Sequence, residues 1–87
     1  MGYNLWAMKK SINSKEHKKL LEHLIQLRLN AGVTQVELSK KLKVHQSFVS
    51  KYETGERRLD LIELKQICTV LGISLKEFVD GFEKELR

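Results

Sequence analysis

The chain has 87 residues, of which 41% are hydrophobic and 31% are charged, and its formal net charge is +5. This length allows one small domain, and no apolar run approaches the roughly 20 residues that a membrane-spanning helix needs. The single cysteine excludes an internal disulfide, and the N-terminus lacks the apolar core of a signal peptide. We therefore expect one globular domain in a reducing cytoplasm.

The charge is unevenly distributed along the sequence. Residues 1–59 contain 12 Lys and Arg against 5 Asp and Glu, a net charge of +7, whereas residues 60–87 contain 4 against 6, a net charge of −2. A basic region of this kind favours a polyanionic partner such as nucleic acid. Charge alone would also fit a protein that is simply kept soluble by it, so motifs must decide between the two.

Residues 1–13 are interpreted as an N-terminal arm in front of a domain that spans residues 14–87. Tyr3, Leu5 and Trp6 form a small apolar cluster in the arm, and two lysines follow it. Chain termini are commonly disordered, which is the simplest interpretation. The alternative is an arm that packs on a partner subunit or contacts DNA through its lysines.

The domain begins with a predicted helix from Ser14 to about Ala31. Ser14 is a good N-cap residue, and Gly32 can take the left-handed conformation that ends helices. Leucines recur at helical spacing along this stretch and indicate a buried face: Leu20, Leu24 and Leu27.

Two short helices joined by a tight turn are predicted between Thr34 and Gly55. Thr34, followed three residues later by Glu37, forms a capping box that marks the start of the first helix. The second helix is predicted over residues 46–54 and ends at Gly55. Its outer face consists of hydrogen-bonding and cationic side chains and carries no carboxylate: Gln46, Ser47, Ser50, Lys51 and Thr54. Such a face suits the major groove of B-DNA.

Two further helices complete the domain. Asp60 with Glu63 starts a helix over residues 61–71, and Ser74 with Glu77 starts the last helix. The inward-facing residues of helix 61–71 are predicted to be Leu61, Leu64, Ile67, Cys68 and Leu71.

An apolar stripe runs along the last helix and is longer than the core of a small monomer needs. We therefore expect part of it to contact a second subunit. The dimer candidates in this stripe are Phe78, Phe82 and Leu86.

The stretch from Thr34 to Gly55 resembles the helix-turn-helix of the Cro and phage-repressor (XRE-like) family of bacterial DNA-binding proteins. The resemblance covers roughly residues 20–78, with the helix-turn-helix at 35–54, and implies an all-α, five-helix Cro/repressor-like domain. The residues that carry it are Thr34, Gln35, Glu37, Leu38, Leu42, Val44, Val49, Ser50, Lys51, Glu53, Gly55, Leu61, Leu64, Leu71, Gly72, Ile73, Ser74 and Phe78.

Lys43 and His45 depart from the usual pattern of the family at the turn. The family usually has Gly at the position of Lys43 and Ser or Thr at the position of His45. Lysine tolerates a left-handed backbone less well than glycine, and histidine caps a helix less well than serine. We expect a less stable turn in the same fold, and a contact with phosphate or a base could compensate for either residue.

Arg28 and Glu53 are expected to form a structural ion pair. Glu53 lies on the inward face of helix 46–54, where an unpaired carboxylate is very costly. The resemblance implies that an arginine at the position of Arg28 pairs with this glutamate. In the alternative, Glu53 reaches solvent at the end of its helix.

The resemblance implies that helix 46–54 enters the major groove of double-stranded DNA. Gln46, Ser47 and Lys51 would read base edges there, with Gln46 suited to adenine and Lys51 to guanine. His45 and Ser50 would contact bases or phosphate. The remaining DNA contacts would be to the backbone, from Thr34, Gln35, Lys43, Arg57 and Arg58.

The function predicted from these features is sequence-specific DNA binding by a transcriptional regulator, with a repressor preferred. One recognition helix covers few base pairs, so we expect a homodimer on a near-palindromic operator. The alternative is a protein-interaction module, such as an antitoxin or an adaptor, on the same fold. The sequence has no zinc-ligand spacing, phosphate loop or catalytic constellation, so we expect no enzymatic activity, metal, cofactor or small-molecule ligand.

Overall fold

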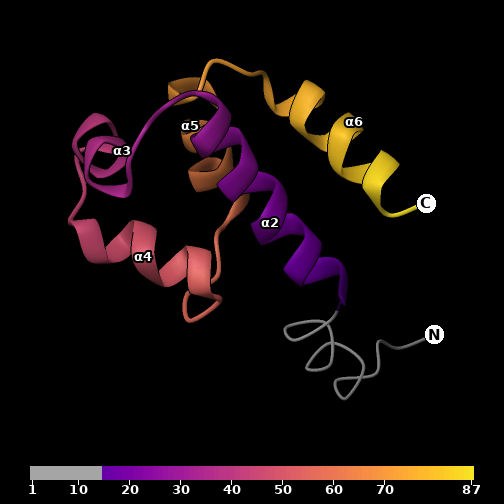
Figure 1. Cartoon of the computed structure of the whole chain (residues 1–87), viewed down its shortest axis with the longest axis horizontal. Coiled ribbons are helices and arrows are strands. Elements are labelled where there is room, and N and C mark those ends of the chain that lie inside the picture. The colour runs from indigo at the N-terminus through magenta and orange to yellow at the C-terminus, as the bar shows by residue number, and fades with distance from the viewer. Residues whose placement is uncertain (1–14) are drawn as a thin grey trace.

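Helices dominate residues 15–87, the part of the chain that the computed structural model describes (Figure 1). The predictions for the arm over residues 1–13 and for the Ser14 cap lie outside these described residues. Five helices are observed within them, and no strand, which confirms the all-α prediction. The helices are α2 (Lys15–Asn30), α3 (Gln35–Leu42), α4 (Gln46–Thr54), α5 (Leu61–Val70) and α6 (Leu75–Glu85).

Local capping sets where the helices begin. Thr34 Oγ1 accepts from the Glu37 N–H at 3.1 Å, and the Thr34 N–H donates to Glu37 Oε1 at 3.2 Å, so α3 starts with the predicted capping box. The same reciprocal pair forms at α5, between Asp60 and Glu63, with lengths of 2.7 and 2.9 Å. Ser74 caps α6 through its side chain. These bonds satisfy first-turn N–H groups that would otherwise lack helical acceptors.

The core forms where α2, α3, α4, α5 and α6 meet. Its fully buried side chains come from all five helices: Leu24, Leu38, Val49, Tyr52, Ile67, Cys68 and Phe78. Burial raises the pKa of the Cys68 thiol to about 11, which keeps it protonated and unreactive at neutral pH. This agrees with the prediction that Cys68 faces inward.

Two predicted orientations were wrong. Leu61 was predicted to face inward, but it is 63% exposed, because it is the first residue of α5 and lies at the edge of the domain. Phe78 was predicted to lie in a subunit contact, but it is only 1% exposed. It lies in the core because its ring packs against His23 of α2, with the ring centroids 4.9 Å apart.

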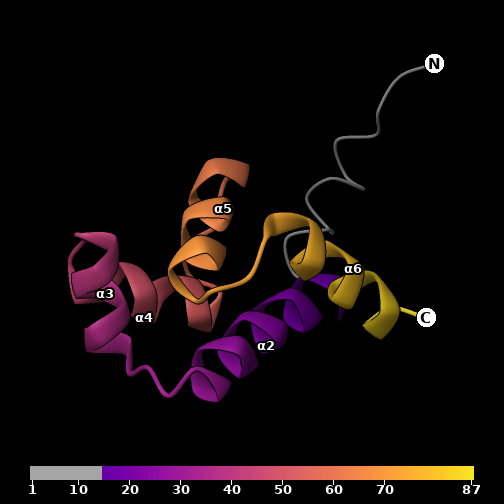
Figure 2. The same cartoon turned by 90° about the horizontal axis from the view of Figure 1, so that it is seen from above.

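The helix-turn-helix occupies one end of the domain. α3 and α4 lie together there, α6 lies at the other end, and α2 runs between them (Figures 1 and 2). α4 packs on α3 and α2, whereas α5 packs on α3 and α6. None of the helices in residues 15–87 combines the length and apolar character that would let it span a membrane.

Contacts along its length attach α6 to α2. His23 Nδ1 lies 3.0 Å from Glu85 Oε1, and Lys19 Nζ donates to the Glu85 carbonyl oxygen at 3.0 Å. A Cβ at Gly81 would come within 3.1 Å of the His23 ring, so the glycine allows this close approach. α6 is therefore an integral part of the domain, and Phe78 of its apolar stripe packs on α2.

Candidate nucleic-acid interface

The turn between α3 and α4 contains a lysine in the left-handed conformation. Lys43 has φ 59° and ψ 43°, and its N–H donates to the Lys40 carbonyl oxygen at 3.1 Å. A side chain with a Cβ is disfavoured there by roughly 1–2 kcal/mol relative to the right-handed region. The Lys43 side chain is exposed, so the strained turn places a cation immediately before the second helix of the motif.

His45 caps α4 in place of the usual serine or threonine. Its Nδ1 accepts from the Ser47 N–H at 3.1 Å and lies 2.9 Å from Ser47 Oγ. Because Nδ1 acts as the acceptor, the proton of the neutral ring is on Nε2, which can donate outward from this exposed side chain. The histidine thus performs the capping role and keeps a second donor for a ligand.

The two sides of α4 differ as the sequence predicted. Val49 and Tyr52 are fully buried on the inner side, and Glu53 is 9% exposed. Gln46 and Lys51 are exposed on the outer side. The remaining outer residues are the half-buried Ser47 and Ser50 and the exposed Thr54. α4 therefore presents hydrogen-bonding groups and one cation, and no carboxylate, to whatever approaches it.

Arg28 and Glu53, the pair expected from the sequence, are joined by two hydrogen bonds. Arg28 Nε donates to Glu53 Oε2 at 2.7 Å, and Nη2 donates to Oε1 at 3.1 Å. Nη1 donates to the Val33 carbonyl oxygen at 2.9 Å. The hydrogen bond to Glu53 raises the pKa of Arg28 above its ordinary value. These bonds satisfy both buried charges and fix α4 against α2.

Gln35 also belongs to this buried group. Its Nε2 donates to Glu53 Oε1 at 2.9 Å, and the side chain is half-buried. The family resemblance implied that Gln35 contacts a DNA phosphate. The structure leaves its side-chain oxygen and its backbone N–H, at the start of α3, for such a contact, which stays a prediction.

The two arginines of the loop after α4 differ in their contacts. Arg57 donates to both carboxylate oxygens of Glu63, at 2.8 and 3.1 Å, and its guanidinium lies 4.5 Å from the centroid of the Phe48 ring. Arg57 Nη1 also donates to the Arg58 carbonyl oxygen at 3.0 Å. Arg58 is exposed. Sequence reasoning treated both arginines alike and gave Glu63 only a capping role. A capping box uses only one carboxylate oxygen of Glu63, so the second oxygen was the one indication in the sequence that Glu63 could accept hydrogen bonds from another residue.

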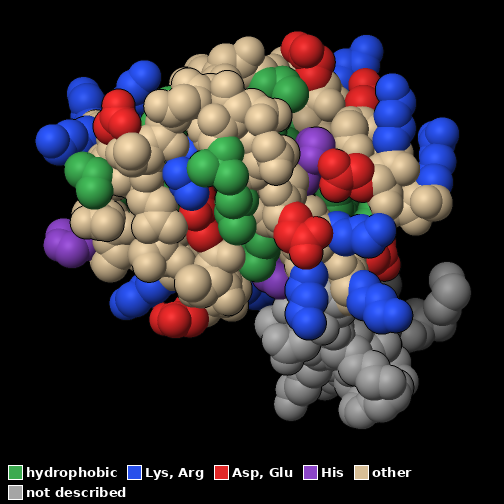
Figure 3. All heavy atoms as spheres, in the orientation of Figure 1, with side chains coloured by type: hydrophobic (Ala, Val, Ile, Leu, Met, Phe, Trp, Pro, Cys, Tyr) green, Lys and Arg blue, Asp and Glu red, His purple; other side chains and the backbone are tan. Residues whose placement is uncertain are grey.

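Figure 3 shows several Lys and Arg side chains at the end of the molecule formed by α3 and α4, with Asp or Glu side chains between them. In the sequence, the predicted DNA-contacting residues lie between the start of α3 and the loop after α4. Among residues 15–87, no group of three or more His, Cys, Asp or Glu side chains lies close enough together to bind a metal ion. The fold and this surface define the class of protein, a helix-turn-helix DNA-binding domain.

Comparison with known proteins gives the family. The helix-turn-helix family pattern matches residues 24–78. An XRE-family like protein from Pseudomonas syringae pv. tomato str. DC3000 superposes with a TM-score of 0.81 at 38% identity, covering 92% of this chain and 98% of that one. No curated protein matches the sequence. The chain belongs to the XRE-like helix-turn-helix family of DNA-binding transcriptional regulators.

Two more solved structures share the fold. The restriction-modification controller protein C.Esp1396I, solved as a tetramer in complex with its natural 35 base-pair operator, has a TM-score of 0.75 at 28% identity, covering 83% of this chain and 95% of that one. The clp gene regulator ClgR from Corynebacterium glutamicum has a TM-score of 0.72 at 24% identity, covering 83% of this chain and 77% of that one. The second likeness concerns the fold alone.

Proposed function

We propose that this chain is a cytoplasmic transcriptional regulator, without catalytic activity, that binds an operator by placing α4 in the major groove. The observation that carries the proposal is the outer face of α4, which exposes Gln46 and Lys51 and no carboxylate. Gln46 is suited to a bidentate pair with adenine, and Lys51 to the acceptors of guanine. Ser47 and Ser50 lie on the same side and complete the base-reading surface.

Residues around α4 supply the contacts that hold it on the duplex. Lys43 and His45 precede α4 and direct a cation and an Nε2 donor outward, and Arg58 follows it with an exposed guanidinium. Thr34 and Gln35 present the start of α3, where backbone N–H groups favour an anion. Such contacts fix the position and orientation of the protein and carry no sequence information. C.Esp1396I, a protein of the same fold, was solved in complex with its operator, which supports DNA binding as the function of this chain.

Binding to duplex DNA at two salt concentrations tests the proposal. A dimer that neutralises about 6–10 phosphates should lose roughly a thousandfold in affinity between about 50 and 200 mM salt. Random duplex at low salt should also bind, because counterion release does not depend on sequence. A protein-interaction module such as an antitoxin or adaptor would bind that duplex poorly, and this result would reject DNA binding as the function.

We place the homodimer contact on α5. Phe78 is in the core, and Phe82 and Leu86 are half-buried. Leu61 and Ile62 of α5 are each 63% exposed. Two large adjacent apolar side chains in solvent favour a partner surface more strongly than a half-buried stripe does.

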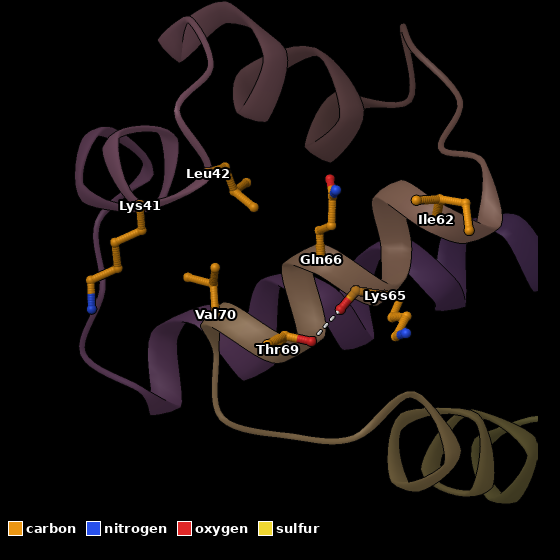
Figure 4. A pocket seen from close by; sticks show the side chains of 7 residues that line it. All are labelled: Lys41, Leu42, Ile62, Lys65, Gln66, Thr69 and Val70. Carbon is orange, nitrogen blue, oxygen red and sulfur yellow. Dashed lines mark hydrogen bonds between the residues drawn. The ribbon is translucent and has the colours of Figure 1, made fainter.

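The surface beside these two residues has the shape that a two-fold contact needs. A hollow of about 430 Å³ lies between α3 and α5, and Figure 4 shows Leu42 of α3 and Val70 of α5 on its two sides. Ile62 also lines the hollow, together with the polar side chains of Lys41, Lys65, Gln66 and Thr69. An isologous contact requires projection and recess on the same patch, so that each copy fills the other. The exposed pair Leu61 and Ile62 and the adjacent hollow provide both, and a second copy of the chain is the occupant we propose.

Two matched substitutions distinguish the surfaces. Ile62→Glu should convert the sedimenting dimer to a monomer, because it replaces the exposed apolar side chain that meets the second copy with a carboxylate, whereas Phe82→Glu should leave the dimer intact. Circular dichroism of both variants checks that they remain helical. A dimer that survives Ile62→Glu and dissociates with Phe82→Glu would place the contact on α6. One wild-type chain per operator would reject the homodimer.

A further inference from the structure

Arg57 contacts both the helix that we place in the major groove and the helix that follows it. The guanidinium lies over Phe48 of α4, 4.5 Å from the ring centroid, and both oxygens of Glu63 of α5 accept hydrogen bonds from it. Glu63 Oε1 also accepts from the Asp60 N–H at 2.9 Å. One arginine thus connects the ring of one helix to the capping box of the next.

This connection matters because α4 and α5 have different main neighbours. α4 packs chiefly on α3 and α2, and α5 packs chiefly on α3 and α6. The loop between them is fixed to α4 by backbone bonds from the Glu56 and Arg57 N–H groups to the Lys51 carbonyl oxygen, at 2.9 and 3.1 Å. The side chain of Arg57 adds the bond to α5. Arg57 therefore joins α4, through Phe48 and the loop, to the first turn of α5.

We propose that Arg57 is a positioning residue for α4 and for Arg58, and not a phosphate contact. The inference rests on the proposed DNA binding. Three of the five N–H donors of the guanidinium are engaged by Glu63 and by the Arg58 carbonyl oxygen, which leaves Nε and the second hydrogen of Nη2 for any other partner. The bonds to Glu63 are charge-assisted, and the position over the Phe48 ring holds the guanidinium further. Arg57 Nη1 also holds the Arg58 carbonyl oxygen at 3.0 Å, which orients the neighbouring backbone. The exposed Arg58 is then the arginine of this loop that contacts phosphate.

Glu63→Gln separates the two roles because they predict opposite effects. Glutamine still accepts from the Asp60 N–H, so the capping box of α5 is retained. The variant loses the charge that holds Arg57. If Arg57 positions α4, affinity for the operator falls. If Arg57 contacts a phosphate whenever Glu63 releases it, affinity rises.

Removal of any carboxylate makes the protein more cationic, so the comparison needs a charge-matched control. Glu56→Gln changes the charge by the same amount, at an exposed residue of the loop that precedes α5. Affinities for the selected operator are measured for wild type, Glu63→Gln and Glu56→Gln at several salt concentrations. We expect Glu63→Gln to bind about fivefold more weakly than Glu56→Gln, with the same slope of log affinity against log salt.

Arg57→Lys provides a second readout with no change of charge. Lysine can still contact a phosphate, but it cannot make the two-bond pair with Glu63. A positioning role predicts a loss similar to that of Glu63→Gln, and a phosphate role predicts affinity close to wild type. Unfolding of each variant, followed by circular dichroism, confirms that binding is measured on folded protein.

Each result bears on the inference. Weaker binding by both Glu63→Gln and Arg57→Lys at an unchanged salt slope supports it. Binding by Glu63→Gln as tight as that of Glu56→Gln, or tighter, overturns it while leaving the DNA-binding function in place. Wild-type protein that binds no duplex at low salt overturns the proposed function and this inference with it.

Discussion

Two arginine–glutamate pairs hold the region of α4, and they differ in solvent exposure. Arg28 and Glu53 have side chains that are 10% and 5% exposed, whereas Arg57 and Glu63 have side chains that are 40% and 24% exposed. Both pairs have two hydrogen bonds, with shortest lengths of 2.7 and 2.8 Å. Similar bond geometry therefore carries different consequences. A buried charge left without its partner is strongly destabilising, whereas an ion pair near water contributes little to stability.

The largest effect should follow from breaking the buried pair. Arg28→Ala and Glu53→Ala should each lower the free energy of unfolding by about 3–5 kcal/mol, because each leaves one buried charge uncompensated. The double variant should lose less than the sum of the two. Urea denaturation of the four proteins gives the interaction energy. Strictly additive losses would show that the two residues do not interact.

The half-exposed pair should show a much smaller effect on stability. The same cycle with Arg57→Gln and Glu63→Gln should give an interaction energy well below that of the buried pair, because solvent screens the two charges. Both glutamines keep the chain uncharged at these positions and preserve much of the side-chain volume. An interaction energy as large as that of the buried pair would contradict the view that this pair acts mainly through orientation.

The smallest effect concerns acid. The hydrogen bonds from Arg57 and from the Asp60 N–H lower the pKa of Glu63 below its ordinary 4.5. A carboxyl with a lower pKa in the folded state stabilises the fold at pH values above the unfolded pKa, and this contribution is lost as the pH falls through the folded pKa. Wild-type protein should therefore lose more unfolding free energy than Glu63→Gln between neutral and acidic pH.

Urea titrations of both proteins across that range provide the measurement. Glu37, the capping glutamate of α3, also has a lowered pKa, mainly because of its hydrogen bonds with Thr34. It is present in both proteins, so its contribution to the loss of stability in acid is the same in each. Equal losses of unfolding free energy on acidification would show that the charge of Glu63 does not contribute to the stability of the fold.

The positions of the helices could be predicted largely from local signals, whereas the Cro/repressor-like arrangement of the five helices followed from the family resemblance. The caps at Thr34, Asp60 and Ser74 act within one helical turn, so sequence alone located the starts of α3, α5 and α6. From the sequence it was also possible to predict the distribution of charged residues on α4. Its inward carboxylate demanded a cation, and Arg28 was the residue available to supply it.

The features that sequence reasoning missed depend on contacts between helices. Periodicity placed Phe78 and Leu61 on apolar stripes, but only packing decides which member of a stripe is covered. The contacts of Arg57 bring its guanidinium together with the Phe48 ring of α4 and the Glu63 carboxylate of α5. No residue spacing in the sequence indicates that these three groups lie close together. Sequence periods describe one helix at a time, whereas these residues are defined by pairs of helices.

The base-reading role of α4 is the central claim, and the most direct test compares Gln46→Ala with Arg58→Ala on the selected operator and on a scrambled duplex. Gln46→Ala should lower the preference for the operator by about 1–3 kcal/mol, because it removes a bidentate base contact. Arg58→Ala should weaken both duplexes alike and reduce the salt slope by about 1 for each chain. Equal weakening of both duplexes by Gln46→Ala would show that α4 does not read bases through this residue and would contradict the account.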